Sequence, residues 1–336
     1  MLLFVYFVFK NKECPLLDIL KRMTKLKPLS IIYNGKSGFH ASDNEGVYEQ
    51  IMTLFTHYDF EIQVFELEHD MSFNTLMSNV LERHQTSDRA GYEGVVVAAG
   101  GDGTLNAVAT KLVDTGLAMG ILPLGTFNYV ARVLDIPLDL IQAAEVIATG
   151  AQRSVHVASV NDRIYLNNAS LGLYPLFIQK REMYNQRFGR LPLNAYTSAL
   201  DVLIRDRKEL KLSIKVDDHL YPVKTPLIFF GNNQLQLKEM NLQIAECVAQ
   251  GRVAGVVLAK SDKTSLFKML YQLIRGALEQ AKDVYSFSAD RVVVDCKRKK
   301  LKIAIDGEIE ELTTPLTFTV KKNALTIMVP HAAASV

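Results

Sequence analysis

A glycine-rich turn contains the residues of this sequence that are best suited to chemistry. Residues 100–106 are Gly-Gly-Asp-Gly-Thr-Leu-Asn, and they directly follow a continuous apolar run at residues 94–99. Glycines let the backbone turn tightly and bring bare N–H groups close to a polyphosphate. The helix expected at residues 105–113 would add its dipole and its unpaired N–H groups. The pattern predicts a nucleotide site made by Gly100, Gly101, Asp102, Gly103, Thr104 and Asn106.

The aspartate in this turn indicates which kind of nucleotide would bind. A carboxylate beside phosphate is unfavourable unless a cation lies between them. We therefore expect Asp102 to contact Mg²⁺ that arrives with ATP. A simpler role stays open for Thr104 and Asn106, since both residue types can cap a helix without binding any ligand.

Two more polar turns are expected beside the first one. Residues 123–128 follow an apolar strand at residues 118–122, and residues 34–38 follow another at residues 29–33. The carboxyl ends of parallel strands meet at one edge of a sheet, where nucleotide ligands bind. The sequence therefore adds these residues to the predicted nucleotide site: Asn34, Ser37, Gly38, Gly125, Thr126 and Asn128.

Two common nucleotide-binding patterns are excluded. The Asn-Gly-Lys-Ser sequence at residues 34–37 is not a Walker A loop, because the glycine required five residues before Gly35 is Ser30. The dinucleotide fingerprint Gly-x-Gly-x-x-Gly fails as well, since Asn106 stands at the third glycine position.

The elements that position these turns follow from hydrophobic periodicity. Residues 28–150 alternate strands with helices, which predicts a parallel α/β domain. After Gly150 the pattern changes to strands joined by turns, which predicts a mainly antiparallel second domain over residues 151–323. Residues 1–27 form an N-terminal extension. The expected elements are strands at 29–33, 61–67, 94–99, 118–122, 154–159, 163–168, 210–216, 226–230, 253–259, 291–296 and 301–305, and helices at 45–56, 73–83, 105–113, 193–205 and 265–280.

Composition limits the class of protein. The 336 residues are 49% hydrophobic and 22% charged, which is typical of a globular chain rather than a disordered or fibrous one. No run approaches the ~20 apolar residues that cross a bilayer. The three cysteines, at positions 14, 247 and 296, favour neither a disulfide framework nor a zinc site. We expect a cytoplasmic protein.

The charge is unevenly distributed along the chain. Residues 1–150 have 11 Lys and Arg against 18 Asp and Glu, a net of −7, whereas residues 151–336 have 27 against 18, a net of +9. A basic second half suits an anionic membrane surface or nucleic acid, although solvated lysines on a β-rich domain explain it equally well. We expect peripheral membrane association.

These motifs together resemble the diacylglycerol kinase catalytic family, which includes bacterial lipid kinases and sphingosine kinases. The resemblance lies in Gly-Gly-Asp-Gly-Thr-x-Asn at residues 100–106, Pro-Leu-Gly-Thr-x-Asn at 123–128 and Asp-Gly-Glu at 306–308. It also includes Asn34, the Ser-Gly pair after it, and Asn-Asn-Ala-Ser-Leu-Gly at 167–172. The resemblance implies an NAD kinase-like nucleotide-binding domain, a β-rich lipid-substrate domain, and a last strand at residues 324–330 that returns to the first domain.

The resemblance also implies an activity, namely transfer of the γ-phosphate of ATP to a lipid hydroxyl in phospholipid metabolism. Asp306 is then the expected general base, with Glu308 aligning it or binding Mg²⁺. Taken alone, the Asp-Gly at residues 306–307 is equally typical of a β-hairpin turn.

Two positions depart from the pattern of the family. The second loop continues Asn128-Tyr129 where the family has Asn-Asp, and Gln250-Gly251 stands where some bacterial members have Asp-Gly and bind a structural Mg²⁺. We therefore expect no structural metal site in this chain. Outside the resemblance, residues 1–22 are either a mis-assigned beginning before Met23 or a segment whose apolar residues 2–9 enter a membrane interface.

The sequence thus predicts an ATP- and Mg²⁺-dependent lipid kinase whose acceptor is diacylglycerol or a related glycerolipid. Its partner would be lipid at a membrane surface and no nucleic acid, and a homodimer is left open. An apolar cavity of more than about 300 Å³ between the domains would suit this acceptor. The alternatives are a kinase of NAD or of a sugar, and a catalytically idle lipid-binding protein.

Overall fold

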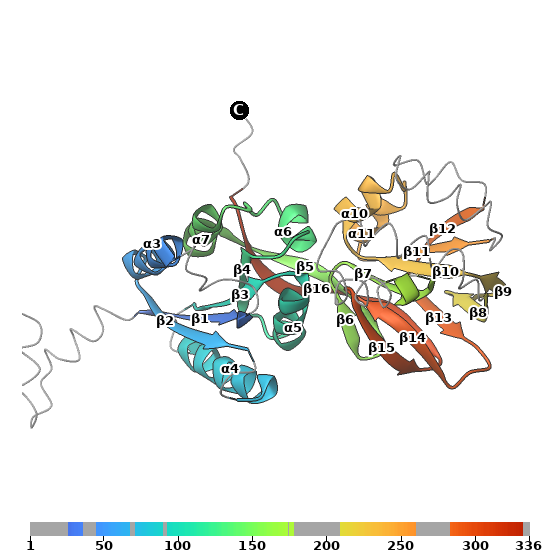
Figure 1. Cartoon of the computed structure of the whole chain (residues 1–336), viewed down its shortest axis with the longest axis horizontal. Helices are drawn as coiled ribbons and strands as arrows, with labels where there is room; N and C mark the ends of the chain where they lie inside the picture. The colour runs from blue at the N-terminus through green and yellow to red at the C-terminus, as the bar shows by residue number, and fades with distance from the viewer. Residues whose placement is uncertain are drawn as a thin grey trace, which may run out of the picture.

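The computed structural model shows two domains that lie side by side (Figure 1). It describes residues 26–35, 45–67, 71–89, 93–173, 175–177, 209–259 and 283–331. The first is an α/β domain built on parallel strands, and the second is a sandwich of antiparallel strands. The predicted fold class is confirmed.

The first domain is built on four parallel strands in the order β2-β1-β3-β4. Their bounds are β1 Lys27–Tyr33, β2 Phe60–Glu66, β3 Val95–Gly100 and β4 Ala118–Pro123. Every residue of β3 and β4 is buried, because helices cover both faces of the sheet (Figure 1). This accounts for their continuous apolar sequence.

The helices of this domain cover opposite faces of its sheet. In Figure 1, α3 and α7 lie above the sheet and α4 and α5 below it. Their bounds are α3 Glu45–His57, α4 Phe73–Arg89, α5 Asp102–Leu112, α6 Tyr129–Val133 and α7 Leu140–Thr149. The helix predicted at residues 105–113 begins three residues earlier, because the glycine-rich turn itself forms its first turn.

The second domain packs two sheets face to face. One sheet continues from the first domain as β16-β13-β8-β9, and the other has the order β12-β11-β10-β7-β14-β15. Tyr165, Phe230 and Phe318 lie in the core between them. The bounds are β5 Ala151–Val160, β6 Arg163–Tyr165, β7 Asn168–Gly172, β8 Leu210–Val216, β9 His219–Thr225, β10 Leu227–Gly231, α10 Gln234–Glu239, α11 Ala245–Ala249, β11 Val253–Leu258, β12 Val284–Ala289, β13 Arg291–Asp295, β14 Lys300–Ile305, β15 Glu308–Thr313 and β16 Leu316–Val329.

Two long strands, β5 and β16, join the domains. They pair antiparallel with each other and pass from one domain into the other (Figure 1). β16 pairs with β13 at its start and with β4, in parallel, at Thr326 and Ile327. Accordingly, Phe318 lies in the core of the second domain and Leu325 in that of the first. A single strand, β16, therefore contributes to both cores.

One predicted strand is corrected. Residues 163–168 are not one strand but two, β6 in the first sheet and β7 in the second, and the chain crosses between the sheets at Leu166 and Asn167. The N–H groups at this crossing donate to a side chain rather than to a strand.

Some predictions lie outside the described residues. These are the helices at residues 193–205 and 265–280, and both hypotheses about residues 1–22. In the part of the chain that is described, no helix has the length and apolarity required to cross a bilayer.

A buried histidine should make stability depend on pH. His84 of α4 is fully buried, and its Nε2 lies 3.0 Å from Ser30 Oγ. Burial lowers the pKa of its imidazole to about 4, and the positive charge of Arg83 contributes a smaller part of this shift. The unfolded chain takes up this proton near pH 6.5, so this group favours unfolding as the pH falls from 6.5 towards 4. Denaturant titrations should show a loss of about 3 kcal/mol in unfolding free energy over that range that is absent in His84→Gln. An equal loss in both proteins would contradict this assignment.

Candidate active site

The two glycine-containing loops of the predicted nucleotide site touch each other. They follow the neighbouring strands β3 and β4, and the N–H of Leu124 donates to the carbonyl of Gly100 at 3.0 Å. A methyl group added to Gly125 would lie 2.7 Å from the Cα of Gly101, so the loops cross where neither residue has a side chain. This close approach explains why both positions are glycine.

The start of α5 presents backbone donors beside this crossing. Gly101 is the N-cap residue. The N–H groups of the first turn of a helix have no partner inside the helix, and in α5 no side chain caps them. Asp102 stands in that turn, and its Oδ1 accepts from the N–H of Val130 in α6 at 3.3 Å. Thr104 is buried against Gly100. The predicted turn is therefore a helix start of the kind that can bind an anion, with one carboxylate at its entrance.

The second loop is closed by its own asparagine. Asn128 adopts a left-handed conformation with φ 50°, its Oδ1 accepts from the N–H of Gly125 at 2.9 Å, and its Nδ2 donates to the Gly125 carbonyl at 2.9 Å. Its side chain is buried and shapes the loop, while Thr126 is exposed. Of the third predicted loop, Asn34 lies at the end of β1 beside β3, and Ser37 and Gly38 lie outside the described residues.

Asp306 approaches these loops from the second domain. It occupies the two-residue turn between β14 and β15 with Gly307, at φ values of 45° and 91°. The expected Asp-Gly hairpin turn is therefore present. Its carboxylate accepts from the backbone N–H groups of Leu166, Asn167 and Asn168 at 2.7 to 2.9 Å, and from Asn106 Nδ2 at 2.9 Å. The turn thus holds its aspartate against α5 of the other domain.

The surroundings of Asp306 change its acidity. Burial raises the pKa of this carboxyl to about 6, the three backbone N–H donors oppose the rise, and the charge of Asp102 adds to it. The neighbouring Tyr165 is fully buried, and burial together with the charge of Asp306 raises the pKa of its phenol. A carboxylate with a pKa near 6 is suited to take a proton near neutral pH.

Glu308 completes the group of acidic residues around the turn. It is exposed at the start of β15, and its Oε1 would lie 3.5 Å from a methyl group added to Gly103. A cavity of about 140 Å³ opens beside it, with Asn106 and Asp306 in its wall. Two residues of the glycine-rich turn, Gly103 and Asn106, therefore line one space with Asp306 and Glu308, about 200 positions away in the sequence.

Comparison with known families agrees with this arrangement. Residues 28–160 match the model of the diacylglycerol kinase catalytic domain, and residues 180–329 match the YegS C-terminal NAD kinase beta sandwich-like domain. The chain belongs to the diacylglycerol and lipid kinase family.

Individual relatives are distant. The chain is 25% identical to a diacylglycerol kinase from Bacillus subtilis over 64% of this chain and 71% of that protein, and 26% identical to one from Staphylococcus aureus over 66% and 71%. An uncharacterized protein from Synechocystis is 26% identical over 76% of this chain, but the chain spans only 59% of that protein. The solved structure of a diacylglycerol kinase from Bacillus anthracis has a TM-score of 0.67 at 19% identity, covering 91% of this chain and 98% of that one. This likeness shows the fold.

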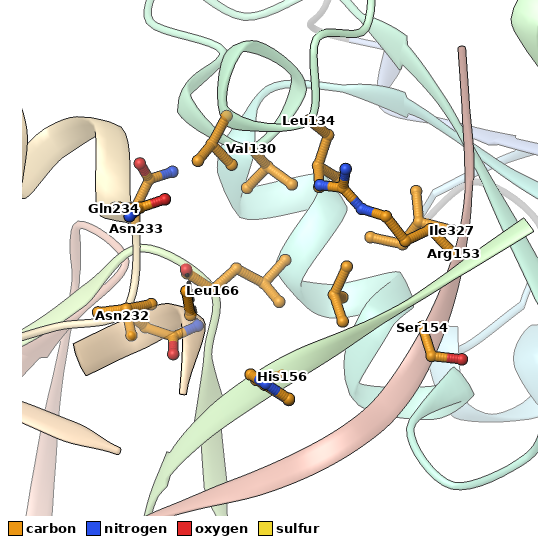
Figure 2. Close-up of a pocket in the computed structure, with 14 residues that line it drawn as sticks. Val130, Leu134, Arg153, Ser154, His156, Leu166, Asn232, Asn233, Gln234 and Ile327 are labelled. Atoms are coloured by element: carbon orange, nitrogen blue, oxygen red, sulfur yellow. Dashed lines mark hydrogen bonds between the residues drawn. The ribbon is translucent and has the colours of Figure 1, made fainter. Parts of the chain in front are cut away.

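In this member of the lipid kinase family, a second cavity separates the domains on the side of α6. Its volume is about 260 Å³, smaller than the expected cavity, and polar and apolar side chains share its lining. Figure 2 shows Val130 and Leu134 on one side of it and Asn232, Asn233 and Gln234 on another, with Arg153 extending towards Leu134. Among the described residues, this cavity is thus somewhat smaller than the one that would suit a lipid acceptor.

Side-chain hydrogen bonds join α6 to α10 and to its N-cap residue, next to this cavity. Arg132 donates to Glu239 at 2.8 Å and lies 5.6 Å from the ring centre of Tyr129, and Asn233 Nδ2 donates to the Tyr129 carbonyl at 3.0 Å. Tyr129 is the position at which the family pattern has aspartate.

Among the described residues, no group of three or more His, Cys, Asp or Glu side chains is arranged to hold a metal ion.

The sequence did not predict the partners that fix Asp306. The segment at residues 167–172 was singled out only for its resemblance to the family, whereas its backbone N–H groups at Asn167 and Asn168 are what hold the carboxylate. Nothing in the residue types could show this, because the donors are main-chain groups freed by the crossing between sheets.

Proposed function

We propose that the protein is an ATP-dependent lipid kinase that transfers the γ-phosphate of ATP to the hydroxyl of diacylglycerol or a related glycerolipid. The observation that supports this most is the position of Asp306, a carboxylate with a raised pKa that faces the glycine-rich helix start across the domain boundary. Phosphoryl transfer requires neutralisation of charge, alignment, and a group that accepts the proton of the attacking hydroxyl.

Each part of the site has a task in this reaction. The unpaired N–H groups at the start of α5 and the crossing of Gly101 with Gly125 bind and align the phosphates. Asp306 receives the proton of the lipid hydroxyl as its oxygen attacks the γ-phosphorus and ADP leaves. Asp102 and Glu308 suit Mg²⁺ that arrives with ATP, because Mg²⁺ is bound by one or two carboxylates together with substrate phosphates. The ion would neutralise charge on the phosphates.

The choice of a lipid acceptor follows from the family. The first domain matches the model of the diacylglycerol kinase catalytic domain, and curated relatives are named diacylglycerol kinases. The net charge of +9 over residues 151–336 would favour contact with an anionic bilayer. The protein would thus work as a peripheral enzyme that visits the membrane for its acceptor.

Transfer of label tests the proposal. Purified protein is incubated with Mg²⁺, γ-labelled ATP and micelles of diacylglycerol, monoacylglycerol, ceramide or sphingosine, and in parallel with NAD and sugars. Label in a glycerolipid is the expected result. Label in NAD or a sugar instead would replace the lipid acceptor, and no label in any acceptor would favour an idle lipid-binding protein.

The pKa of Asp306 predicts how the rate depends on pH. The base must be ionised, so kcat/KM should be constant above about pH 7, be halved near pH 6, and fall roughly tenfold per unit below about pH 5. An ordinary aspartate, with a pKa of 3.8, would keep the rate constant to about pH 4. Rates measured between about pH 4.5 and 8, with the fold checked by circular dichroism at each pH, decide this. A constant rate down to about pH 5 would exclude Asp306 as the base.

A further inference from the structure

The carboxylate of Asp306 has no acceptor position left for a substrate. An ionised carboxylate offers about four lone-pair sites. Oδ1 accepts from the N–H groups of Asn167 and Asn168, both at 2.9 Å. Oδ2 accepts from the N–H of Leu166 at 2.7 Å and from Asn106 Nδ2 at 2.9 Å. A lipid hydroxyl can therefore give its proton to Asp306 only if one of these four donors leaves.

Three of the four donors cannot leave without breaking the fold. They are main-chain groups of residues 166–168, where the chain crosses from β6 to β7, and the N–H of Asp306 in turn donates to the carbonyl of Asn168 at 2.9 Å. Moving Asn168 would disturb the pairing of β7 with β10, and moving Asn167 would break the hydrogen bonds that its carbonyl accepts from Asn232 and Asn233.

The fourth donor differs because it is a side chain from the other domain. Asn106 lies in α5, and rotation about its side-chain bonds moves its amide without any change in the backbone. A second acceptor is within reach, since its Nδ2 also lies 3.5 Å from the carbonyl of Ile164. Thr110 Oγ1 donates to the main-chain carbonyl of Asn106 at 2.8 Å and lies 3.3 Å from Asn106 Oδ1, so no strong hydrogen bond restrains the amide on that side.

We propose that Asn106 is a positioning residue that holds Oδ2 of Asp306 in the resting enzyme and gives up this place to the hydroxyl of the acceptor. The inference depends on the proposed function. The space for the incoming hydroxyl is the cavity of about 140 Å³ whose wall contains Asn106, Asp306 and Glu308. There the O–H of the acceptor donates to Oδ2. Its proton passes to Oδ2 as its oxygen bonds to the γ-phosphorus and the bond from that phosphorus to the β,γ-bridging oxygen breaks; ADP leaves, and Asp306 then releases the proton to water.

The variant Asn106→Ala tests this role through the KM for the acceptor. Without the amide, the hydroxyl of the acceptor no longer displaces a hydrogen bond to Oδ2, so the KM for lipid should fall by about fivefold. The KM for ATP should stay at the wild-type value. The matched control is Lys111→Ala, on the same helix and outside the cavity, whose KM for lipid should coincide with that of the wild type.

The outcomes separate this inference from the proposed function. Failure of the wild type to label any lipid sinks the proposed function. Labelling by wild type and Asn106→Ala with the same KM for lipid overturns only the inference. A raised KM for ATP with an unchanged KM for lipid would make Asn106 a nucleotide ligand instead, as its place in the glycine-rich motif first suggested. If Asn106→Ala does not fold, Asn106→Ser decides by the same comparison of KM values, since its shorter side chain cannot span to Oδ2.

Discussion

Replacing Asp306 by Asn should lower the rate of lipid phosphorylation by about 10²- to 10⁴-fold, the usual contribution of a positioned general base. Asparagine has nearly the same shape but cannot accept the proton of the hydroxyl. The glycine loops lie in the other domain, so the change should leave ATP binding in place, which a nucleotide-dependent shift in melting temperature measures.

Asp217→Asn is a matched control for this substitution. Asp217 also stands at a positive φ, 48°, and its Oδ1 also accepts two backbone N–H groups, those of Asp290 and Arg291. It lies in the turn between β8 and β9, away from the glycine-rich turn. Its variant should phosphorylate lipid at the wild-type rate. Full activity of Asp306→Asn would move the role of base to Asp102.

Gly125→Ala should have the second large effect, a rise in the KM for ATP of at least about tenfold. The new methyl group would lie 2.7 Å from the Cα of Gly101 and 2.7 Å from Asn128 Oδ1. The first neighbour is backbone and the second closes the loop, so neither can move without displacing one of the two loops that we propose bind the phosphates. Misplacement by about 1 Å can cost 10²-fold in rate.

Gly46→Ala is the control for added bulk at a glycine. It lies in α3, and no atom lies within 4 Å of the new methyl group. Alanine there should leave the KM unchanged and favour the helix by roughly 0.5–1 kcal/mol. Calorimetric titration with a non-hydrolysable ATP analogue compares the two variants. Wild-type affinity in Gly125→Ala would exclude the crossing of the loops from nucleotide binding.

Much of the first domain could be predicted because strands that are buried on both faces have continuous apolar sequences. The apolar runs of β3 and β4 placed those strands to within a residue, and the turns after them followed from glycine. Because the two strands are parallel neighbours, the sequence also predicted that Gly101 and Gly125 lie at the same edge of the sheet. Here local pattern and tertiary position agree, since each loop immediately follows a strand.

The parts that escaped prediction depend on contacts distant in sequence. The three residues at 219–221 that begin β9 are exposed, so hydrophobic pattern does not mark this edge strand. The crossing at Leu166 looks like a continuous strand because both halves are buried. The side chain of Asn128 was expected to line the pocket and instead closes its own loop, and the amide of Asn106 meets a residue 200 positions away. Neither partner could be found from local sequence.

A single-turnover assay tests the central claim most directly. Enzyme in excess over γ-labelled ATP is mixed with Mg²⁺ and micellar diacylglycerol near pH 8, and label is counted in the lipid phase for the wild type and Asp306→Asn. The proposal predicts that one labelled phosphate per ATP enters lipid with the wild type, while Asp306→Asn leaves the label on ATP over the same time. Label released as inorganic phosphate, or lipid labelled equally by both proteins, would contradict it.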